Sequence, residues 1–462
     1  MTKLRKFVLK DVRCFEGRQE FEIRPLTFLV GENSTGKSTV LGCMQALANT
    51  IDSHKDPHFD FNAEPYQMGS FADIARKIGG RGGKSSSFDL GFEIQVEKKE
   101  TIHLLFTLIE RESGSEPNTK QLKMEFEDFS LVFETKEQNG RPDSRSGMGK
   151  SPSKRTLENG KPVYTFKIYG DEGDLFREIL YLGFFVSHEN ALEYHDEFKE
   201  FLKKNTTRLI AGSSSSKTSF FSRRGYGFSA LLPPYSDFSF ESFAPIRSKP
   251  MRTYDPVREV EDPEGSGMPM TLMNMYRNDQ KGWENMQKKL VKFGNASGLF
   301  TDIKIRKHGR SVNDPFQLQI KARGPQTNII DVGYGVSQIL PILVRVFNTR
   351  RINNFLVQQP EVHLHPKGQA ELCSLLVDIA KEHGHSFILE THSDAVINRA
   401  RIEIMKGNLD PKDFSLIYLE PEGNKVKVHN ISFDKEANMI NVPDSYGDFF
   451  LQEHDKLLGF GE

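Results

Sequence analysis

The residues from Leu26 to Asn49, LTFLVGENSTGKSTVLGCMQALAN, constrain the fold more than any other part of the sequence. A short apolar, β-prone run is followed by a loop with two glycines and then by a proline-free run of helix-forming residues. The loop GENSTGKS fits the pattern G-x-x-x-x-G-K-[ST], in which backbone N–H groups and the start of the next helix bind phosphate oxygens. The sequence therefore predicts a strand–loop–helix unit that binds a nucleoside triphosphate.

Every residue of this loop is a candidate contact of the nucleotide. Lys37 is expected to reach the β- and γ-phosphates, and the Ser38 hydroxyl is expected to bind Mg²⁺. The other candidates for contact with the phosphates are Gly31, Glu32, Asn33, Ser34, Thr35, Gly36 and Thr39. The expected cofactors are therefore a nucleoside triphosphate and Mg²⁺, and the family resemblance given below implies that the nucleotide is ATP.

Composition and charge restrict the class of protein. The net charge of −1 excludes a global basic field for binding nucleic acid, although a local basic patch stays compatible with it. The three cysteines are widely spaced and predict neither a disulfide framework nor a metal cluster. No signal-peptide pattern or bilayer-length apolar run is present, so we expect a cytoplasmic protein without membrane association.

Hydrophobic periodicity predicts an α/β fold with three parts. Residues 1–80 are expected to form the N-terminal part of the lobe that carries the phosphate loop, with a hairpin before that loop. Residues 81–240 are expected to be β-rich, with a helical and loop insertion that includes a mobile segment at 136–161. In residues 241–462, strands alternate with helices, which predicts a parallel sheet. The helices expected from these patterns include Asp174–Phe185, His188–Lys204 and Met270–Gly294.

Two segments of the C-terminal part place polar residues at the ends of predicted strands. The first is FLVQQPEVHLHP, Phe355–Pro366, and the second is ILETHSD, Ile388–Asp394. Ligands lie at the carboxyl ends of the strands in open α/β sheets. His392 in the second segment has two interpretations, a structural histidine or a γ-phosphate contact, and its place after a sheet strand favours the second.

Together with VGYGVSQ (332–338), these motifs resemble those of ABC-type P-loop ATPases, in the branch that contains RecF, the SMC-type heads and the OLD nucleases. The resemblance covers both flanks of the chain but not its middle. It implies that the segment with Gly335 and Ser337 contacts the γ-phosphate bound by another protomer, and that His392 is the switch histidine. It also implies a Q-loop role for Gln67.

The sequence departs from this family at the end of the Walker B strand. The family has two carboxylates there, whereas this chain has Gln358 and Gln359. A glutamine oxygen can accept a hydrogen bond from a metal-bound water, so Gln358 stays a candidate contact, but it cannot take a proton at neutral pH. Glu361 and Glu390 are the replacement candidates for the catalytic base, and the sequence leaves the choice open. We therefore expect slow hydrolysis and a long-lived ATP-bound state.

Two further comparisons with the family concern other chemistry. The residues after 414 are too few for the Toprim domain that follows the ATPase in OLD nucleases. The spacing E-x-H-x-H of Glu361, His363 and His365 could also suit a metal site. LHP is ordinary in this ATPase branch, however, which favours the interpretation without a metal. The segment FAPIRSKP also resembles a family element and assigns Arg247 to the core around the site.

The leading hypothesis is a regulatory ATPase that oligomerises and controls a separate effector. In this respect the chain resembles the AriA-type ATPases of the PARIS anti-phage system, which hold a Toprim nuclease until a phage trigger protein is sensed. A composite site requires at least a dimer, and further interfaces would build a larger ring. The alternatives are a scaffold that never hydrolyses ATP and a RecF-like DNA-binding repair ATPase. Candidate DNA contacts are Arg81, Lys84, Arg223 and Arg224.

Overall fold

The computed structural model describes residues 3–52, 59–79, 83–96, 100–111, 116–125, 130–136, 154–158, 161–169, 240–256, 262–349 and 354–447. The chain divides into two compact units. Unit 1 comprises residues 1–23, 39–240 and 421–428, and unit 2 comprises residues 24–38, 241–420 and 429–462. Both units are therefore assembled from segments that are far apart in the sequence.

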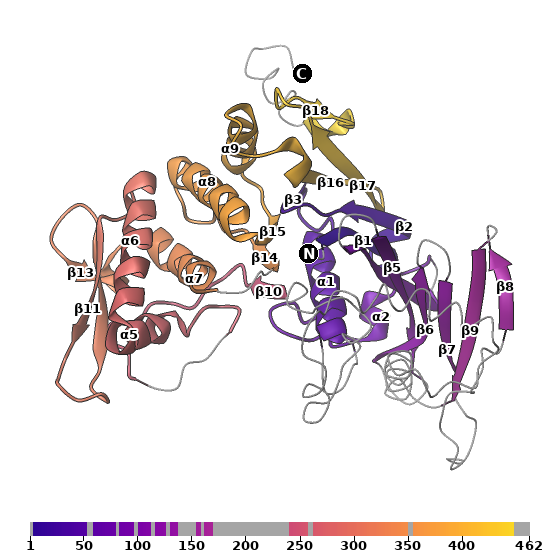
Figure 1. Ribbon diagram of the computed structural model, residues 1–462, viewed down its shortest axis with the longest axis horizontal. Helices are drawn as coiled ribbons and strands as arrows, with labels where there is room; N and C mark the ends of the chain where they lie inside the picture. The colour runs from indigo at the N-terminus through magenta and orange to yellow at the C-terminus, as the bar shows by residue number, and fades with distance from the viewer. Residues whose placement is uncertain are drawn as a thin grey trace, which may run out of the picture. The chain divides into compact units, whose positions relative to one another are not determined.

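Unit 1 is built on an eight-stranded sheet with the order β2-β1-β4-β5-β6-β7-β9-β8 (Figure 1). The predicted hairpin before the phosphate loop is present, because β1 and β2 pair in antiparallel fashion. The sheet is antiparallel except where β7 and β9 run parallel. Its strands are β1 (Lys3–Val12), β2 (Phe15–Glu22), β4 (Ser87–Val96), β5 (Glu100–Glu110), β6 (Pro117–Glu125), β7 (Ser130–Lys136), β8 (Lys154–Glu158) and β9 (Lys161–Tyr169).

Phenylalanine rings form the core of unit 1 on one face of this sheet. Alternate residues of a strand point to the same face, so a period of two gathers the rings. Phe7 contacts Phe21 and Phe92 at ring-centroid distances of 5.8 and 5.5 Å. The short helix α2 (Phe71–Ile74) adds Phe71, which stacks on Phe88. This unit also contains most of helix α1 (Lys37–Asp52).

Unit 2 contains a seven-stranded sheet with the order β10-β14-β15-β3-β16-β17-β18. β14, β15, β3 and β16 are parallel, so their carboxyl ends meet at one edge. All five residues from Leu26 to Val30 of β3 are buried, as expected for a central strand covered on both faces. The strands are β3 (Leu26–Gly31), β10 (Phe240–Phe243), β14 (Asn354–Gln358), β15 (Ser386–Glu390), β16 (Phe414–Glu422), β17 (Lys425–Phe433) and β18 (Met439–Ile440).

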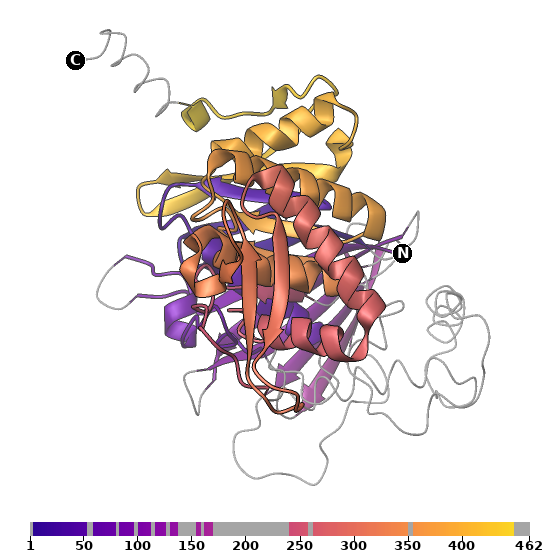
Figure 2. The same cartoon turned by 90° about the vertical axis from the view of Figure 1, so that its left-hand side faces the viewer.

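Helices and a small antiparallel sheet complete unit 2. The three-stranded sheet β11-β12-β13 lies beside α6, as Figure 2 shows. These elements are β11 (Asp302–Lys307), β12 (Phe316–Lys321), β13 (Thr327–Asn328), α5 (Met268–Asn278), α6 (Gln280–Ser297), α7 (Tyr334–Asn348), α8 (Pro366–His383) and α9 (Asp394–Met405). They share one hydrophobic core with the large sheet. None of the described helices is both long and apolar enough to cross a bilayer.

The α/β prediction, with a mixed N-terminal sheet and a parallel-sheet core, is confirmed by these two sheets. The helical stretch predicted for Met270–Gly294 is present as two helices, α5 and α6, which meet at Asp279, whose carboxylate caps α6 by accepting the Gly282 N–H. The mobile-loop prediction for 136–161 is wrong at Lys154–Glu158, where backbone pairing with β9 forms β8. The remainder of that segment and the helices predicted between 174 and 204 lie outside the described residues.

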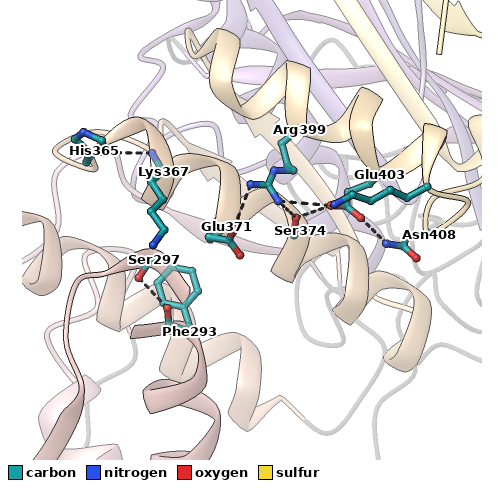
Figure 3. Close-up of polar contacts among 10 residues, drawn as sticks. Phe293, Ser297, His365, Lys367, Glu371, Ser374, Arg399, Glu403 and Asn408 are labelled. Atoms are coloured by element: carbon teal, nitrogen blue, oxygen red, sulfur yellow. Dashed lines mark hydrogen bonds and ion pairs between the residues drawn. The ribbon is translucent and has the colours of Figure 1, made fainter. Parts of the chain in front are cut away.

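A buried carboxylate joins α8 to α9 in unit 2 (Figure 3). Glu403 of α9 accepts hydrogen bonds from the Ser374 hydroxyl at 2.8 Å and from the Asn408 amide at 2.6 Å. Arg399, one turn earlier on α9, lies 3.8 Å from Glu403 and pairs with Glu371 of α8 at 3.1 Å. Because only 4% of Glu403 is exposed, its charge is stabilised by these partners rather than by water.

This network predicts a specific acid sensitivity of unit 2. Burial raises the pKa of Glu403, but the hydrogen bonds from Asn408 and Ser374 and the charge of Lys406 outweigh it, so the pKa lies below 4.5. A lowered folded-state pKa stabilises the fold above pH 4.5, and this contribution is lost as the pH falls below it. We expect Glu403→Gln to lower the free energy of unfolding by about 1–3 kcal/mol at pH 7, measured by urea denaturation.

The difference between Glu403→Gln and the wild type should shrink as the pH falls below 4.5, because the wild-type carboxylate then becomes neutral too. The matched control is Glu382→Gln on α8, whose side chain is 71% exposed, and it should leave stability unchanged. A difference in the free energy of unfolding between Glu403→Gln and the wild type that stayed constant through the acid range would contradict the lowered pKa of Glu403.

Candidate nucleotide-binding site

The phosphate loop joins β3 to α1 as the sequence predicted. Gly31 has φ +147°, and a Cβ atom there would lie 2.6 Å from the carbonyl oxygen of Leu419 on β16. Only glycine therefore fits where the loop leaves the sheet. Thr35 is buried and donates its hydroxyl to the Glu32 carbonyl at 2.9 Å. The loop tip formed by Glu32, Asn33 and Ser34 is exposed, and the loop returns through Gly36 to α1.

Lys37 lies folded along this loop. Its ammonium donates hydrogen bonds to the carbonyl oxygens of Gly31 at 3.0 Å and Glu32 at 2.7 Å, and the residue is only 4% exposed. Burial lowers the pKa of Lys37, and the charge of Glu390 opposes this shift. The loop thus holds one buried cation close to backbone N–H groups at the start of a helix, which is an arrangement that attracts phosphate oxygens.

A carboxylate from the neighbouring strand contacts the helix start. Glu390 ends β15, is 6% exposed, and accepts a hydrogen bond from the Ser38 hydroxyl at 2.9 Å. The same carboxylate oxygen lies 3.5 Å from the side-chain nitrogen of Gln358, which is paired with Glu390 in the sheet register. Gln359, at φ +42°, donates its backbone N–H to the Glu390 carbonyl at 2.8 Å. The two glutamines and the glutamate therefore meet at one edge of the sheet.

Glu361 is oriented by the residues that follow β15. One of its carboxylate oxygens accepts the Thr391 hydroxyl at 2.7 Å and the His392 backbone N–H at 3.0 Å. Burial raises the pKa of Glu361, while these hydrogen bonds and the charge of Arg247 oppose the shift. The His392 side chain is exposed, and its pKa is lowered first by desolvation and then by the charge of Lys37. Glu361 therefore fixes the backbone from which His392 projects.

The segment VGYGVSQ (332–338), called the signature segment from its resemblance to the family motif, contains the first turn of α7. Ser337 is 4% exposed, and its hydroxyl donates to the Tyr334 carbonyl at 2.8 Å. Gly335 is buried, and a Cβ atom there would lie 2.5 Å from the His363 carbonyl oxygen. Gly333 and Tyr334 are the exposed residues at this helix start. Contact of Gly335 and Ser337 with a second protomer stays a prediction.

The remaining predicted site residues are placed as follows. Thr39 and Gln67 belong to unit 1, where Arg13 donates to the Thr39 hydroxyl at 3.0 Å and to the Met68 carbonyl at 2.8 Å. Gln67 is exposed and has φ +36°. Their roles at the nucleotide stay predictions.

The residues present suit Mg²⁺ better than a histidine-bound metal. Ser38 and Glu390 supply oxygen ligands, which Mg²⁺ prefers, next to the loop that would bind phosphates. His365 instead caps α8 by accepting the Lys367 N–H at 3.3 Å (Figure 3), and the His363 ring meets Tyr334 edge-on. Within the described ranges, no three His, Cys, Asp or Glu side chains converge on a metal site. His365 thus serves helix capping and His363 serves ring packing in this structure, and a metal site with the E-x-H-x-H spacing stays an untested alternative.

Sequence reasoning missed the hydrogen bonds that Gln338 and Thr391 make beside this site, and it assigned Arg247 to the core without a partner. Gln338 accepts the Arg247 N–H at 3.2 Å, and Arg247 in turn donates to the Gln358 carbonyl at 2.9 Å. In the sequence, each of these residues stands beside or within a predicted motif, which indicates that it lies near the site. The sequence does not show which side chains form hydrogen bonds with one another.

The close approach at Gly335 predicts contrasting effects for two neighbouring glycines. Gly335→Ala should lower the free energy of unfolding by about 1–3 kcal/mol, because the new methyl group must displace the backbone at His363. Gly333→Ala is the matched control: its Cβ meets nothing within 4 Å and its φ of −56° suits alanine. Urea denaturation of both variants checks this. Equal stability of the two variants would show that the packing at Gly335 is unimportant.

The chain is similar to solved structures of SMC head domains at low sequence identity. The solved structures that match include an SmcHead bound to the C-winged helix domain of ScpA, with 10% identity, coverage of 94% of this chain and 98% of that chain, and a TM-score of 0.46. The SMC head domain from Thermotoga maritima matches with 11% identity, coverage of 92% of this chain and 98% of that chain, and a TM-score of 0.36. A third match is an Smc head domain with an extended coiled coil, bound to the C-terminal domain of ScpA derived from Pyrococcus furiosus. It has 9% identity, covers 99% of this chain and 99% of that chain, and has a TM-score of 0.42.

The sequence comparisons give one family. No curated protein sequence matches the chain. Residues 271–397, which contain α7, β14 and β15, match the model of a family described as an AAA ATPase domain. This part of the chain is therefore similar to an AAA-type ATPase domain.

Proposed function

We propose that the chain is an ATP-binding, slowly hydrolysing ABC-type ATPase that assembles on ATP and controls a separate effector protein. The observation that carries the proposal is the hydrogen bond between Ser38 and Glu390, beside the neutral Gln358. The similarity of residues 271–397 to an AAA ATPase domain supports ATP as the nucleotide.

Binding of ATP is supported by the charges at the loop. Lys37 offers one cation, and the loop backbone and the start of α1 offer N–H groups to the phosphates. Ser38 and Glu390 would hold Mg²⁺, which neutralises phosphate charge when it is bound. The hydrogen bond between Ser38 and Glu390 supports a role for Glu390 in place of the Walker B carboxylate of P-loop ATPases, with the carboxylate supplied by β15 rather than by β14.

Slow hydrolysis is supported by the way both carboxylates are engaged. Glu390 accepts the Ser38 hydroxyl, and Glu361 accepts two hydrogen bonds from Thr391 and His392. The strand-end positions that usually supply a base hold Gln358 and Gln359, which cannot accept a proton at neutral pH. ATP would therefore be bound for longer than it would be in a site with a free base.

Assembly on ATP is proposed from the start of α7. Gly333 and Tyr334 are exposed there, and the first N–H groups of a helix lack partners within the helix. A two-fold dimer would bring this helix start in each protomer to the nucleotide of the other, and it is the simplest closed arrangement. Further interfaces would extend the dimer to a larger ring.

The effector is proposed to be a Toprim-type nuclease in anti-phage defence, released when a phage protein is sensed. This part rests on the motif resemblance and on a site suited to a long-lived ATP-bound state. The RecF-like alternative lacks support at Lys84, which pairs with Glu110 at 2.6 Å. The other candidate DNA contacts, Arg81, Arg223 and Arg224, lie outside the described residues, and DNA binding stays an untested alternative.

Lys37→Ala tests ATP binding. Loss of the ammonium removes charge-assisted contacts with phosphate worth about 3 kcal/mol, so we expect a roughly 100-fold weaker affinity for ATP, measured by equilibrium binding of a fluorescent analogue. The ATP-dependent increase in particle mass should disappear with it. Lys304→Ala, at a side chain that is 60% exposed, is the control and should behave like the wild type. Normal assembly of Lys37→Ala would remove ATP binding from the mechanism.

The effector is tested by purifying the wild-type chain together with the product of the adjacent open reading frame. We expect a nuclease-like protein to co-purify with the wild type and to be lost from Lys37→Ala. Failure of any neighbouring nuclease-like protein to co-purify would contradict the effector role while leaving ATP binding intact.

Turnover by the wild type should lie below the ordinary range of kinases, about 1–100 s⁻¹. Gln359→Glu should raise kcat on the order of 10²-fold, because it places a proton acceptor at the end of β14. Gln317→Glu on β12 controls for the added negative charge and should leave kcat unchanged. Steady-state phosphate release checks this. Rapid wild-type turnover, or an unchanged kcat in a Gln359→Glu variant that binds ATP, would contradict slow hydrolysis through a missing base.

A further inference from the structure

Arg247 is among the largest fully buried side chains of unit 2. It follows β10 and is 1% exposed. Desolvation lowers its pKa to about 10, and the charge of Glu361 opposes this shift, so the guanidinium is charged at neutral pH. A buried cation without a complete set of partners lowers the stability of the fold. Its position therefore requires an explanation beyond packing.

The contacts of Arg247 join two elements of the nucleotide site. Its backbone N–H donates to the side-chain oxygen of Gln338 on α7 at 3.2 Å. Its Nη2 donates to the backbone carbonyl of Gln358, the last residue of β14, at 2.9 Å. Arg247 thus connects the helix that carries the signature segment with the strand that carries the Walker B position.

Three side chains around this connection have buried polar atoms without a hydrogen-bond partner among the described residues. They are Nε and Nη1 of Arg247, Nε2 of Gln338 and Oε2 of Glu361. Buried polar atoms are nearly always paired, so three such residues in one cluster point to a second arrangement in which they are used. The cluster supplies two kinds of donor, guanidinium and amide, and one carboxylate acceptor.

The carboxylate of Glu361 also binds the segment that contains Thr391 and His392. The other oxygen of Glu361 binds the Thr391 hydroxyl and the His392 N–H. A shift of this segment towards a bound γ-phosphate would weaken these two bonds. Glu361 would then be free to pair with the unused N–H groups of Arg247, and Arg247 is attached to α7 through Gln338.

We propose that Arg247 is a positioning residue that couples the nucleotide site to the start of α7, through a Glu361 carboxylate shared between the His392 segment and the guanidinium. The inference rests on the proposed function, because it assigns the transmission step between ATP binding and assembly. In one state Glu361 holds the His392 segment, and in the other it pairs with Arg247 and fixes α7. ATP and a second protomer therefore favour the same state.

The test separates ATP affinity from ATP-dependent assembly. Arg247→Met removes the guanidinium, and Gln338→Leu removes the attachment at α7 without leaving a charge unpaired. We expect both variants to bind a fluorescent ATP analogue within about threefold of the wild type, because neither side chain lies in the phosphate loop. The ATP-dependent increase in particle mass, measured by light scattering, should be lost in both.

A purely structural role is distinguished by a matched control. Leu290→Ala in the core of α6 should lower the unfolding midpoint through a cavity, yet it should keep ATP-dependent assembly. Arg247→Met/Glu361→Gln, which removes both buried charges, should recover part of the midpoint lost in Arg247→Met without recovering assembly. If Arg247→Met does not fold, Gln338→Leu decides the question.

Normal ATP-dependent assembly of the folded Arg247→Met and Gln338→Leu variants would overturn the inference. So would recovery of assembly together with the midpoint in Arg247→Met/Glu361→Gln, because Arg247 would then act through stability alone. If the wild type binds no ATP, the proposed function itself fails, and that result differs from a wild type that assembles on ATP alongside variants that assemble equally well.

Discussion

The hydrogen bond between Ser38 and Glu390 is the contact on which the candidate site depends. It joins the first turn of α1 to the end of β15, and it exists because β3 and β15 are parallel neighbours whose carboxyl ends reach the same edge. The Gln358 amide approaches the same carboxylate from β14. The amide of a neutral residue on one strand thus lies beside the carboxylate of the next strand, and this carboxylate places a negative charge at the edge of the sheet.

Three buried polar residues lie near this contact, and hydrophobic burial alone would not place polar groups there. Glu361, Arg247 and Gln338 are nearly inaccessible to water, and each has at least one atom without a partner among the described residues. Such groups lower the stability of this arrangement, whereas apolar residues of similar size would pack at no such cost. Buried polar groups of this kind are typical of functional sites, where local consistency gives way to chemistry.

The helix that follows the phosphate loop, α1, contributes residues to both units. The first two residues of α1 belong to unit 2 and the rest of the helix belongs to unit 1. At the third residue, Thr39, the hydroxyl accepts a hydrogen bond from Arg13, which also binds the Met68 carbonyl next to Gln67. Helix α1 is therefore continuous from Lys37, assigned to unit 2, to Asp52, assigned to unit 1.

Local patterns in the sequence determined the phosphate loop, the strands and most helices, because glycine spacing and apolar periodicity act over a few residues. The resemblance to the ATPase family, rather than these patterns, named Glu361 and Glu390 as candidates for the catalytic base, and that role stays a prediction. Only the tertiary structure decided their different partners, since Glu390 lies 352 residues from Ser38 in the sequence and Glu361 lies 30 from Thr391. Strand order brings these groups together, and side-chain orientation at the strand ends then decides which hydrogen bonds form.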